Sequence, residues 1–204
     1  MLFEIQETTK DLSCYSLIEY LVNDQFKGKS IVSASLRARS IVVLQILADI
    51  DPATPIVFCH AGSIFPESVE YKQFIIDRLG LTNVREPQEK ESDTMPGDYD
   101  HVEWLKARYD GSPGAMKEAM HLNKSLDGFE CWISAVYHNP YDGSKINRID
   151  VEGKVIRINP LLDWTREDVV KFMKANDLPF HKLAPHDPVY PKHEGDQLTP
   201  FYSY

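Results

Sequence analysis

The chain has 204 residues, 43% hydrophobic and 26% charged, which are the proportions of a folded globular domain rather than a disordered segment. Its formal net charge of −9 disfavours nucleic acid as a partner, because phosphate contacts need clustered Lys and Arg. No apolar run approaches the ~20 residues that cross a bilayer, and the N-terminus lacks the features of a secretory signal. We therefore expect a cytoplasmic protein that does not bind membranes.

Strand and helix patterns alternate over the first 85 residues. The predicted elements are a helix at about 11–23, then strand 30–34, helix 40–48, strand 55–59, helix 66–79 closed by Gly80, and strand 83–85. A β-α-β-α-β order of this kind is typical of a parallel sheet whose two faces are covered by helices. The sequence therefore predicts the α/β class.

The remainder of the chain extends the same pattern after a polar stretch. Residues 86–114 are rich in Pro, Gly and Asp, and we interpret them as a connection or lid within one domain. The elements predicted after it are helix 115–126, strand 130–136, strand 155–158 and helix 166–175. Thr165 and Asp168 form a capping box at the start of the last helix. We expect one domain over 1–204, with a core at 1–185 and an irregular tail at 186–204.

The turn after the first strand is rich in hydroxyl and guanidinium groups. It contains Ser33, Ser35, Ser40, Arg37 and Arg39 around a predicted helix start. In parallel sheets the helix N-termini lie at the carboxyl ends of the strands and favour anions. The turn is therefore a candidate phosphate or sulfate site. The alternative is a capped helix with solvated arginines.

The turn after the second strand carries a further candidate set. His60 ends that strand, Gly62 permits a tight turn, and Ser63 can cap the next helix. A histidine at a strand end is more often structural than functional. Its place at the same edge of the sheet as the first turn nevertheless makes this set a candidate part of the same site.

Cysteine and histidine do not form a metal-binding pattern. Cys14, Cys59 and Cys131 are far apart and make no C-x-x-C pair, so we predict buried free thiols in a reducing compartment. Six residues near the C-terminus could ligate zinc, but their spacing matches no tight site, and no metal is predicted: His181, His186, His193, Asp187, Glu194 and Asp196.

Three segments carry a family pattern, in the family order. Residues 56–68 (IVFCHAGSIFPES) follow V-I-F-x-D-T-G-x-L-F-P-E-T, residues 127–133 (DGFECWI) follow x-G-F-D-A-W-I, and residues 157–169 (RINPLLDWTREDV) follow K-V-N-P-L-x-D-W-x-x-x-D-V. In these motifs the chain resembles the phosphoadenylyl sulfate and adenylyl sulfate reductases. The resemblance implies a Rossmann-like, adenine-nucleotide α-hydrolase-like fold, with a mostly parallel sheet and helices on both faces. It also implies an adenine nucleotide or sulfonucleotide ligand and, as a mild expectation, a homodimer.

The sequence departs from this family where the family's chemistry takes place. No cysteine follows Cys131, whereas family reductases use a nucleophilic cysteine in a C-terminal tail. The family's first-loop glycine is Arg37 here, the aspartate of D-T-G is His60, and Tyr137 and His138 replace a pair of arginines. The usual thiol mechanism is therefore disfavoured. We expect no iron–sulfur cluster and no other cofactor.

Two more cations are candidates for binding the ligand. Arg157 matches the lysine of K-V-N-P, and Lys145 could match a later arginine of the family if one residue is inserted. Both could hold a phosphate or sulfate. The alternatives are a surface arginine at a strand edge and a solvated loop lysine.

Two classes of function follow from these observations. The first is a diverged reductase-like enzyme that binds an adenine (sulfo)nucleotide and performs sulfur or nucleotidyl transfer without a C-terminal cysteine. The second is a catalytically inactive nucleotide-binding or interaction protein. In either case the chain could be a subunit of a complex in which a partner supplies the thiol.

Overall fold

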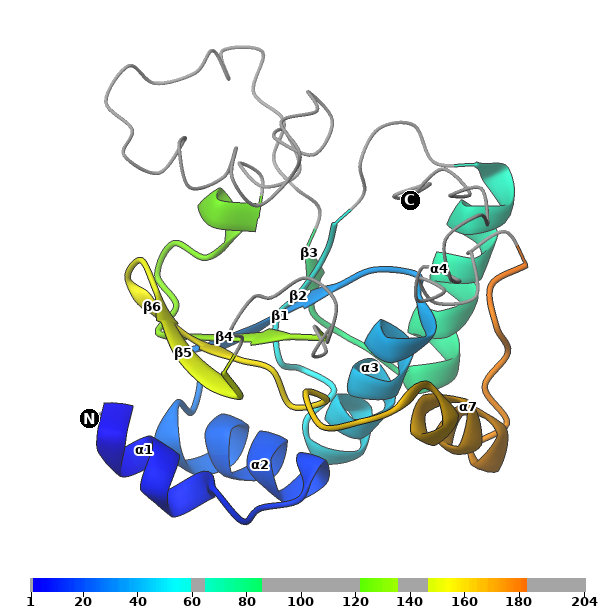
Figure 1. Cartoon of the computed structure of the whole chain (residues 1–204). Helices are drawn as coiled ribbons and strands as arrows, with labels where there is room; N and C mark the ends of the chain where they lie inside the picture. Colours follow the sequence, from blue (N-terminus) through cyan, green and yellow to red (C-terminus); the bar gives the residue numbers. More distant parts are fainter. Residues whose placement is uncertain (1, 60–64, 86–121, 136–146, 183–204) are drawn as a thin grey trace, which may run out of the picture.

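The described part of the chain is built on a six-stranded sheet (Figure 1). The computed structural model describes residues 2–59, 65–85, 122–135 and 147–182. The strands of that part of the chain are β1 (Ser30–Ala34), β2 (Ile56–Phe58), β3 (Val84–Arg85), β4 (Cys131–Ser134), β5 (Ile149–Glu152) and β6 (Val155–Ile158), in the order β3-β2-β1-β4-β6-β5. All neighbouring pairs among them are parallel except β5 and β6, which form an antiparallel hairpin.

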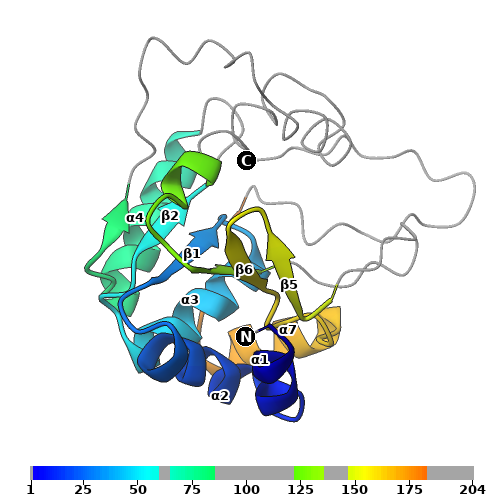
Figure 2. The same cartoon turned by 90° about the vertical axis from the view of Figure 1, so that its left-hand side faces the viewer.

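Most of the described helices lie on one face of the sheet. The described helices are α1 (Leu2–Thr9), α2 (Cys14–Tyr20), the π-helical turn η1 (Leu21–Gln25), α3 (Ala38–Ile50), α4 (Pro66–Leu79) and α7 (Arg166–Ala175). Figures 1 and 2 show α1, α2, α3 and α7 on one side of the sheet and a helical turn at residues 122–125 on the other. The predicted α/β class and mostly parallel sheet are confirmed.

Two apolar clusters hold the layers together, one on each face of the sheet. The larger joins strand residues such as Val32 and Ile133 to the inward sides of α1, α2, α3, α4 and α7. The smaller lies on the opposite face and contains Ile31, Val57, Leu122, Leu126, Trp132 and Val155. Side chains alternate between the faces of a strand, so adjacent residues such as Ile31 and Val32 enter different clusters.

Local capping signals set the ends of two helices where the sequence predicted them. The hydroxyl of Thr165 accepts a hydrogen bond from the backbone N–H of Asp168, whose carboxylate accepts one from the backbone of Thr165, so the capping box of α7 is confirmed. Helix α4 begins at Pro66 and ends at Leu79, and its C-cap residue is Gly80, which has a φ of 63°. Glycine takes this left-handed conformation without a steric penalty.

Two elements were not predicted. Helix α1 is short, and it is held by Ile5 in the larger cluster and by Arg148, which donates to the carbonyl oxygens of Thr9 and Leu12 at its C-terminal end. Strand β5 pairs with β6 through a two-residue turn that begins at Gly153. The first predicted helix is also divided, since α2 begins at Cys14 and continues as η1 to Gln25.

Several predicted features lie outside the described residues, namely the connection at 86–114, most of helix 115–126 and the tail at 186–204. Within the described ranges, no helix is long and apolar enough to cross a membrane.

Candidate functional site

The order of the strands creates one switch point in the sheet. From β1 the chain crosses through α3 to β2 and through α4 to β3, always in the same direction, whereas β4 lies on the opposite side of β1. The carboxyl ends of β1 and β4 are adjacent, with Ser33 beside Ser134. In open α/β sheets, ligands bind outside the carboxyl ends of the strands at such a switch point. We therefore place the candidate site here.

The turn from β1 to α3 is held by its own serines. The hydroxyl of Ser40 accepts from the backbone N–H of Ser35 at 3.0 Å, and the two hydroxyl oxygens are also 3.0 Å apart. The hydroxyl of Ser35 accepts from the backbone N–H of Arg37 at 3.3 Å. Both hydroxyls therefore brace the turn, whereas Arg37, the residue at the N-cap of α3, makes no side-chain capping hydrogen bond.

The two arginines of the same turn are not solvated surface residues. Arg37 directly precedes α3 in an extended backbone conformation, and Arg39 lies in the first turn of that helix. Both are half-buried. They add two positive charges to the helix N-terminus, where the helix dipole also favours an anion. The arrangement can bind a phosphate or sulfate group.

Ser33 is joined to the neighbouring strand by a tryptophan. The indole Nε1–H of Trp132 donates to the Ser33 hydroxyl at 2.8 Å. Trp132 is 5% exposed and belongs to the smaller apolar cluster. This hydrogen bond at the switch point was not predicted from the sequence.

Arg157 is buried, contrary to the alternative of a surface arginine at a strand edge. Strand β6 lies between β4 and β5, and Arg157 is 3% exposed. Its guanidinium donates to the carboxylate of Glu152 and lies over the Trp132 ring, 5.7 Å from the centroid. One side of the guanidinium therefore binds a protein carboxylate and is not available to a ligand.

The three cysteines differ in their environments. Cys14 and Cys131 are buried as predicted, and burial raises the pKa of each thiol to about 12. Cys59 is half-buried, so the prediction that all three are buried is wrong at this position. It directly follows β2, and its backbone N–H donates to the carbonyl oxygen of Ala34 at the end of β1. Cys59 packs against the smaller apolar cluster but is only partly covered by it.

Several candidate residues cannot be placed. His60, Gly62, Ser63 and Lys145 lie outside the described residues. Of the six possible zinc ligands only His181 is described; it is buried, 4.8 Å from Tyr71 between ring centroids, and burial lowers its pKa. The described part of the chain contains no group of three side chains that could hold a metal ion.

Glu152 is the residue of this region that the sequence analysis missed. It precedes Gly153, and the alternating segments Ile149–Glu152 and Val155–Ile158 flank the Gly-Lys pair of a two-residue hairpin. That signal could have placed an acidic side chain near Arg157.

Comparison with known proteins identifies relatives of the chain. The model of the phosphoadenosine phosphosulfate reductase domain matches residues 29–189. The phosphoadenosine 5'-phosphosulfate reductase of Aliivibrio fischeri (strain MJ11) is 29% identical over 174 residues, which cover 78% of this chain and 64% of that protein. The adenosine 5'-phosphosulfate reductase of Chelativorans sp. (strain BNC1) is 28% identical and covers 82% and 68%, respectively. The chain thus spans about two thirds of the length of these relatives.

Solved structures agree on the fold. The phosphoadenylyl-sulfate reductase of Candida auris superposes with a TM-score of 0.62 at 17% identity, covering 89% of this chain and 88% of the other. Yeast FAD synthetase superposes with a TM-score of 0.55 at 15% identity, covering 90% and 68%. These likenesses confirm a Rossmann-like fold of the adenine-nucleotide α-hydrolase type.

Proposed function

Since the chain belongs to the phosphoadenosine phosphosulfate reductase domain family, we propose that it binds an adenine nucleotide or sulfonucleotide at the carboxyl ends of β1 and β4. The observation that carries this proposal is the Ser35–Ser40 turn, braced at the start of α3 and charged by Arg37 and Arg39, at the switch point of the sheet. The phosphate and sulfate oxygens of the ligand face this turn. Helix N-terminal amides and guanidiniums are the groups that stabilise such oxygens.

The chemistry proposed for this site is sulfur or nucleotidyl transfer with an acceptor from outside the chain. In sulfur transfer, an external thiolate attacks the ligand sulfur, the bond from sulfur to the phosphate oxygen breaks, and that oxygen leaves with the electron pair. Burial keeps Cys14 and Cys131 protonated near neutral pH, and no cysteine follows Cys131 in this sequence. No iron–sulfur cluster is involved, since all-cysteine clusters take four thiolates and the sequence has three cysteines.

A non-catalytic nucleotide-binding protein is the second candidate. It is favoured by the burial of two of the three thiols and by Arg37, a bulky cation where the related reductases have a glycine. Such a protein would bind the nucleotide and present it, or a nucleotide-dependent surface, to a partner or a second copy of the chain. A cytoplasmic location suits both candidates, because free cysteines persist in a reducing compartment.

Calorimetric titration with adenylyl sulfate, phosphoadenylyl sulfate, ATP and AMP tests the binding proposal. We expect at least one of the sulfonucleotides to bind. Arg39→Ala should weaken that binding roughly tenfold or more, because the variant loses a charge-assisted hydrogen bond to the ligand. Arg166→Ala is the matched control, since it removes an exposed arginine from the first turn of α7. If none of the four ligands binds, the proposal is wrong.

A second assay separates the two candidate functions. Sulfite release from a bound sulfonucleotide in the presence of thioredoxin or glutathione would support sulfur transfer to an external thiol. Cys59→Ser is a useful companion, because Cys59 is the half-buried thiol at the sheet's carboxyl edge. If Cys59→Ser releases sulfite at the unchanged rate, the attacking thiol belongs to the external reductant. Tight binding without turnover would instead favour the non-catalytic protein.

A further inference from the structure

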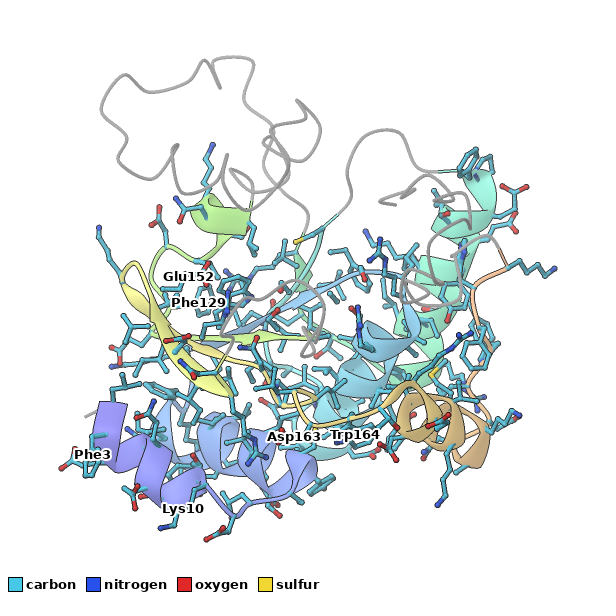
Figure 3. All side chains as sticks on the ribbon, in the orientation of Figure 1. Phe3, Lys10, Phe129, Glu152, Asp163 and Trp164 are labelled. Atoms are coloured by element: carbon cyan, nitrogen blue, oxygen red, sulfur yellow. The ribbon has the colours of Figure 1, made fainter. Side chains whose placement is uncertain are left out.

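Four polar or amphipathic side chains form a continuous series across one face of the sheet. They come from adjacent strands: Glu152 on β5, Arg157 on β6, Trp132 on β4 and Ser33 on β1. Trp132 and Arg157 are direct neighbours in the parallel ladder. Figure 3 labels Glu152, which lies on the side of the sheet away from α1. The series begins at the β5–β6 hairpin and ends at the switch point.

The hydrogen bond between Trp132 and Ser33 sets the direction of the serine hydroxyl. An indole N–H is a donor only, so the Ser33 oxygen must accept, at 2.8 Å. Its own hydrogen is then directed elsewhere, and within the described part of the chain that hydrogen has no acceptor. Ser33 is only half-buried and lies one residue before the end of β1. It is therefore a donor next to the anion-binding turn.

Arg157 and Glu152 fix the position of the tryptophan ring. The guanidinium lies over the ring face at 5.7 Å, an attractive cation–π arrangement that depends on the plane of the indole. The carboxylate of Glu152 holds the guanidinium in turn, and both side chains are almost entirely buried. Buried ion pairs add little net stability compared with packed apolar groups, so the consequence of this pair is geometric.

From this series we propose that Arg157 and Glu152 are positioning residues, which act through Trp132 to hold the Ser33 hydroxyl as a hydrogen-bond donor to a phosphate or sulfate oxygen of the ligand. The proposal rests on the function proposed above and deepens it. It assigns Arg157 a different role from that of a direct anion ligand. Ser33 touches the ligand, whereas Trp132, Arg157 and Glu152 act behind it.

The indole N–H resonances give a direct readout of this series. The chain has three tryptophans, so a ¹⁵N-labelled sample gives three indole signals, and Trp132→Phe assigns the relevant one. Ser33→Ala is expected to move the Trp132 signal upfield in the ligand-free protein, because the hydrogen bond is lost. Trp164→Phe is the control, since Trp164 packs beside Phe172 on α7 and should leave the Trp132 signal unchanged. An unmoved Trp132 signal in Ser33→Ala would overturn the proposal.

Binding of adenylyl sulfate tests the rest of the series in the same samples. We expect the ligand to shift the Trp132 signal in the wild type, and Ser33→Ala, Trp132→Phe and Arg157→Met each to weaken binding roughly tenfold or more. Glu152→Gln keeps the shape of the side chain and removes its charge, so it tests the pair even if Arg157→Met fails to fold. It should shift the Trp132 signal and weaken binding less than Ser33→Ala.

The outcomes distinguish this proposal from the one on which it rests. If the wild type binds adenylyl sulfate and Ser33→Ala binds it equally well, the positioning proposal alone is wrong. Equal binding by Arg157→Met and Glu152→Gln, with an unmoved Trp132 signal, also overturns it. If the wild type binds no nucleotide while Ser33→Ala still moves the Trp132 signal, the ligand is wrong, and both proposals fail despite the correct hydrogen bond.

Discussion

Glu152→Ala should destabilise the protein more than any surface charge removal, because it leaves the Arg157 guanidinium buried without its carboxylate. The side chains of Arg157 and Glu152 are 4% and 12% exposed. Removal of one partner from a buried pair costs about 3–5 kcal/mol. The Trp132 ring still contacts the cation, and Glu152 is not fully buried, so we expect a loss of about 3 kcal/mol.

The chain contains a matched control for this prediction. Lys29 and Glu130 form an ion pair of 2.6 Å between Nζ and Oε1, but their side chains are 55% and 54% exposed. Exposed pairs contribute about 0–1 kcal/mol because water already solvates both charges. Glu130→Ala should therefore lower the free energy of unfolding by less than about 1 kcal/mol.

Urea unfolding followed by tryptophan fluorescence measures both variants. With an m-value of about 2–3 kcal/mol/M, the loss predicted for Glu152→Ala lowers the urea midpoint by roughly 1–1.5 M. The double variant Glu152→Leu/Arg157→Met should recover much of the loss, since it leaves no unpaired buried charge. The reasoning is refuted if Glu152→Ala and Glu130→Ala differ by less than about 0.5 kcal/mol.

Three further predictions concern separate parts of the chain. Thr165→Ala removes the side-chain cap of α7 and should lower the free energy of unfolding by about 1 kcal/mol, measured by the same urea titration. At pH 8, iodoacetamide should label Cys59 well before Cys14 and Cys131, because the latter two thiols are buried and their pKa values are raised to about 12. Mass spectrometry of the peptides gives the order of labelling, and equal rates at the three cysteines would contradict the prediction. Burial lowers the pKa of His181 in the folded protein below its ordinary value of 6.5, so the unfolded chain binds the proton more readily. The free energy of unfolding should therefore decrease as the pH falls through 6.5 toward the lower pKa of the folded state. The decrease in melting temperature from pH 7.5 to pH 5.5 should be larger in the wild type than in His181→Gln.

Local signals in the sequence were enough to predict the elements that form the frame of the site. Strand β1 and helices α4 and α7 have the predicted bounds, because each combines an apolar pattern with its own start or stop signal. Helix α1 has only eight residues, and its stability depends on Arg148 and the core, which lie far away in the sequence. No local pattern could have revealed it.

The candidate site was predictable in place but not in its contacts. The order of strands and helices put Ser33, Ser35 and Ser40 at the carboxyl edge of the sheet, and the structure brings them together there. The contact between Trp132 and Ser33 depends on the register of β1 against β4, which are separated by about a hundred residues. Pairing over that distance is set by packing of the whole sheet, not by local propensity.

The central position of β1 also has a consequence for how the chain folds. Its partner on one side, β2, follows after 21 intervening residues, whereas its partner on the other side, β4, begins at residue 131. During synthesis, β1 is therefore an edge strand with unpaired backbone groups until β4 emerges from the ribosome. The apolar composition of β1 makes that interval the stage at which the chain is most exposed to aggregation, and closure of the sheet by β4 is a late step of folding.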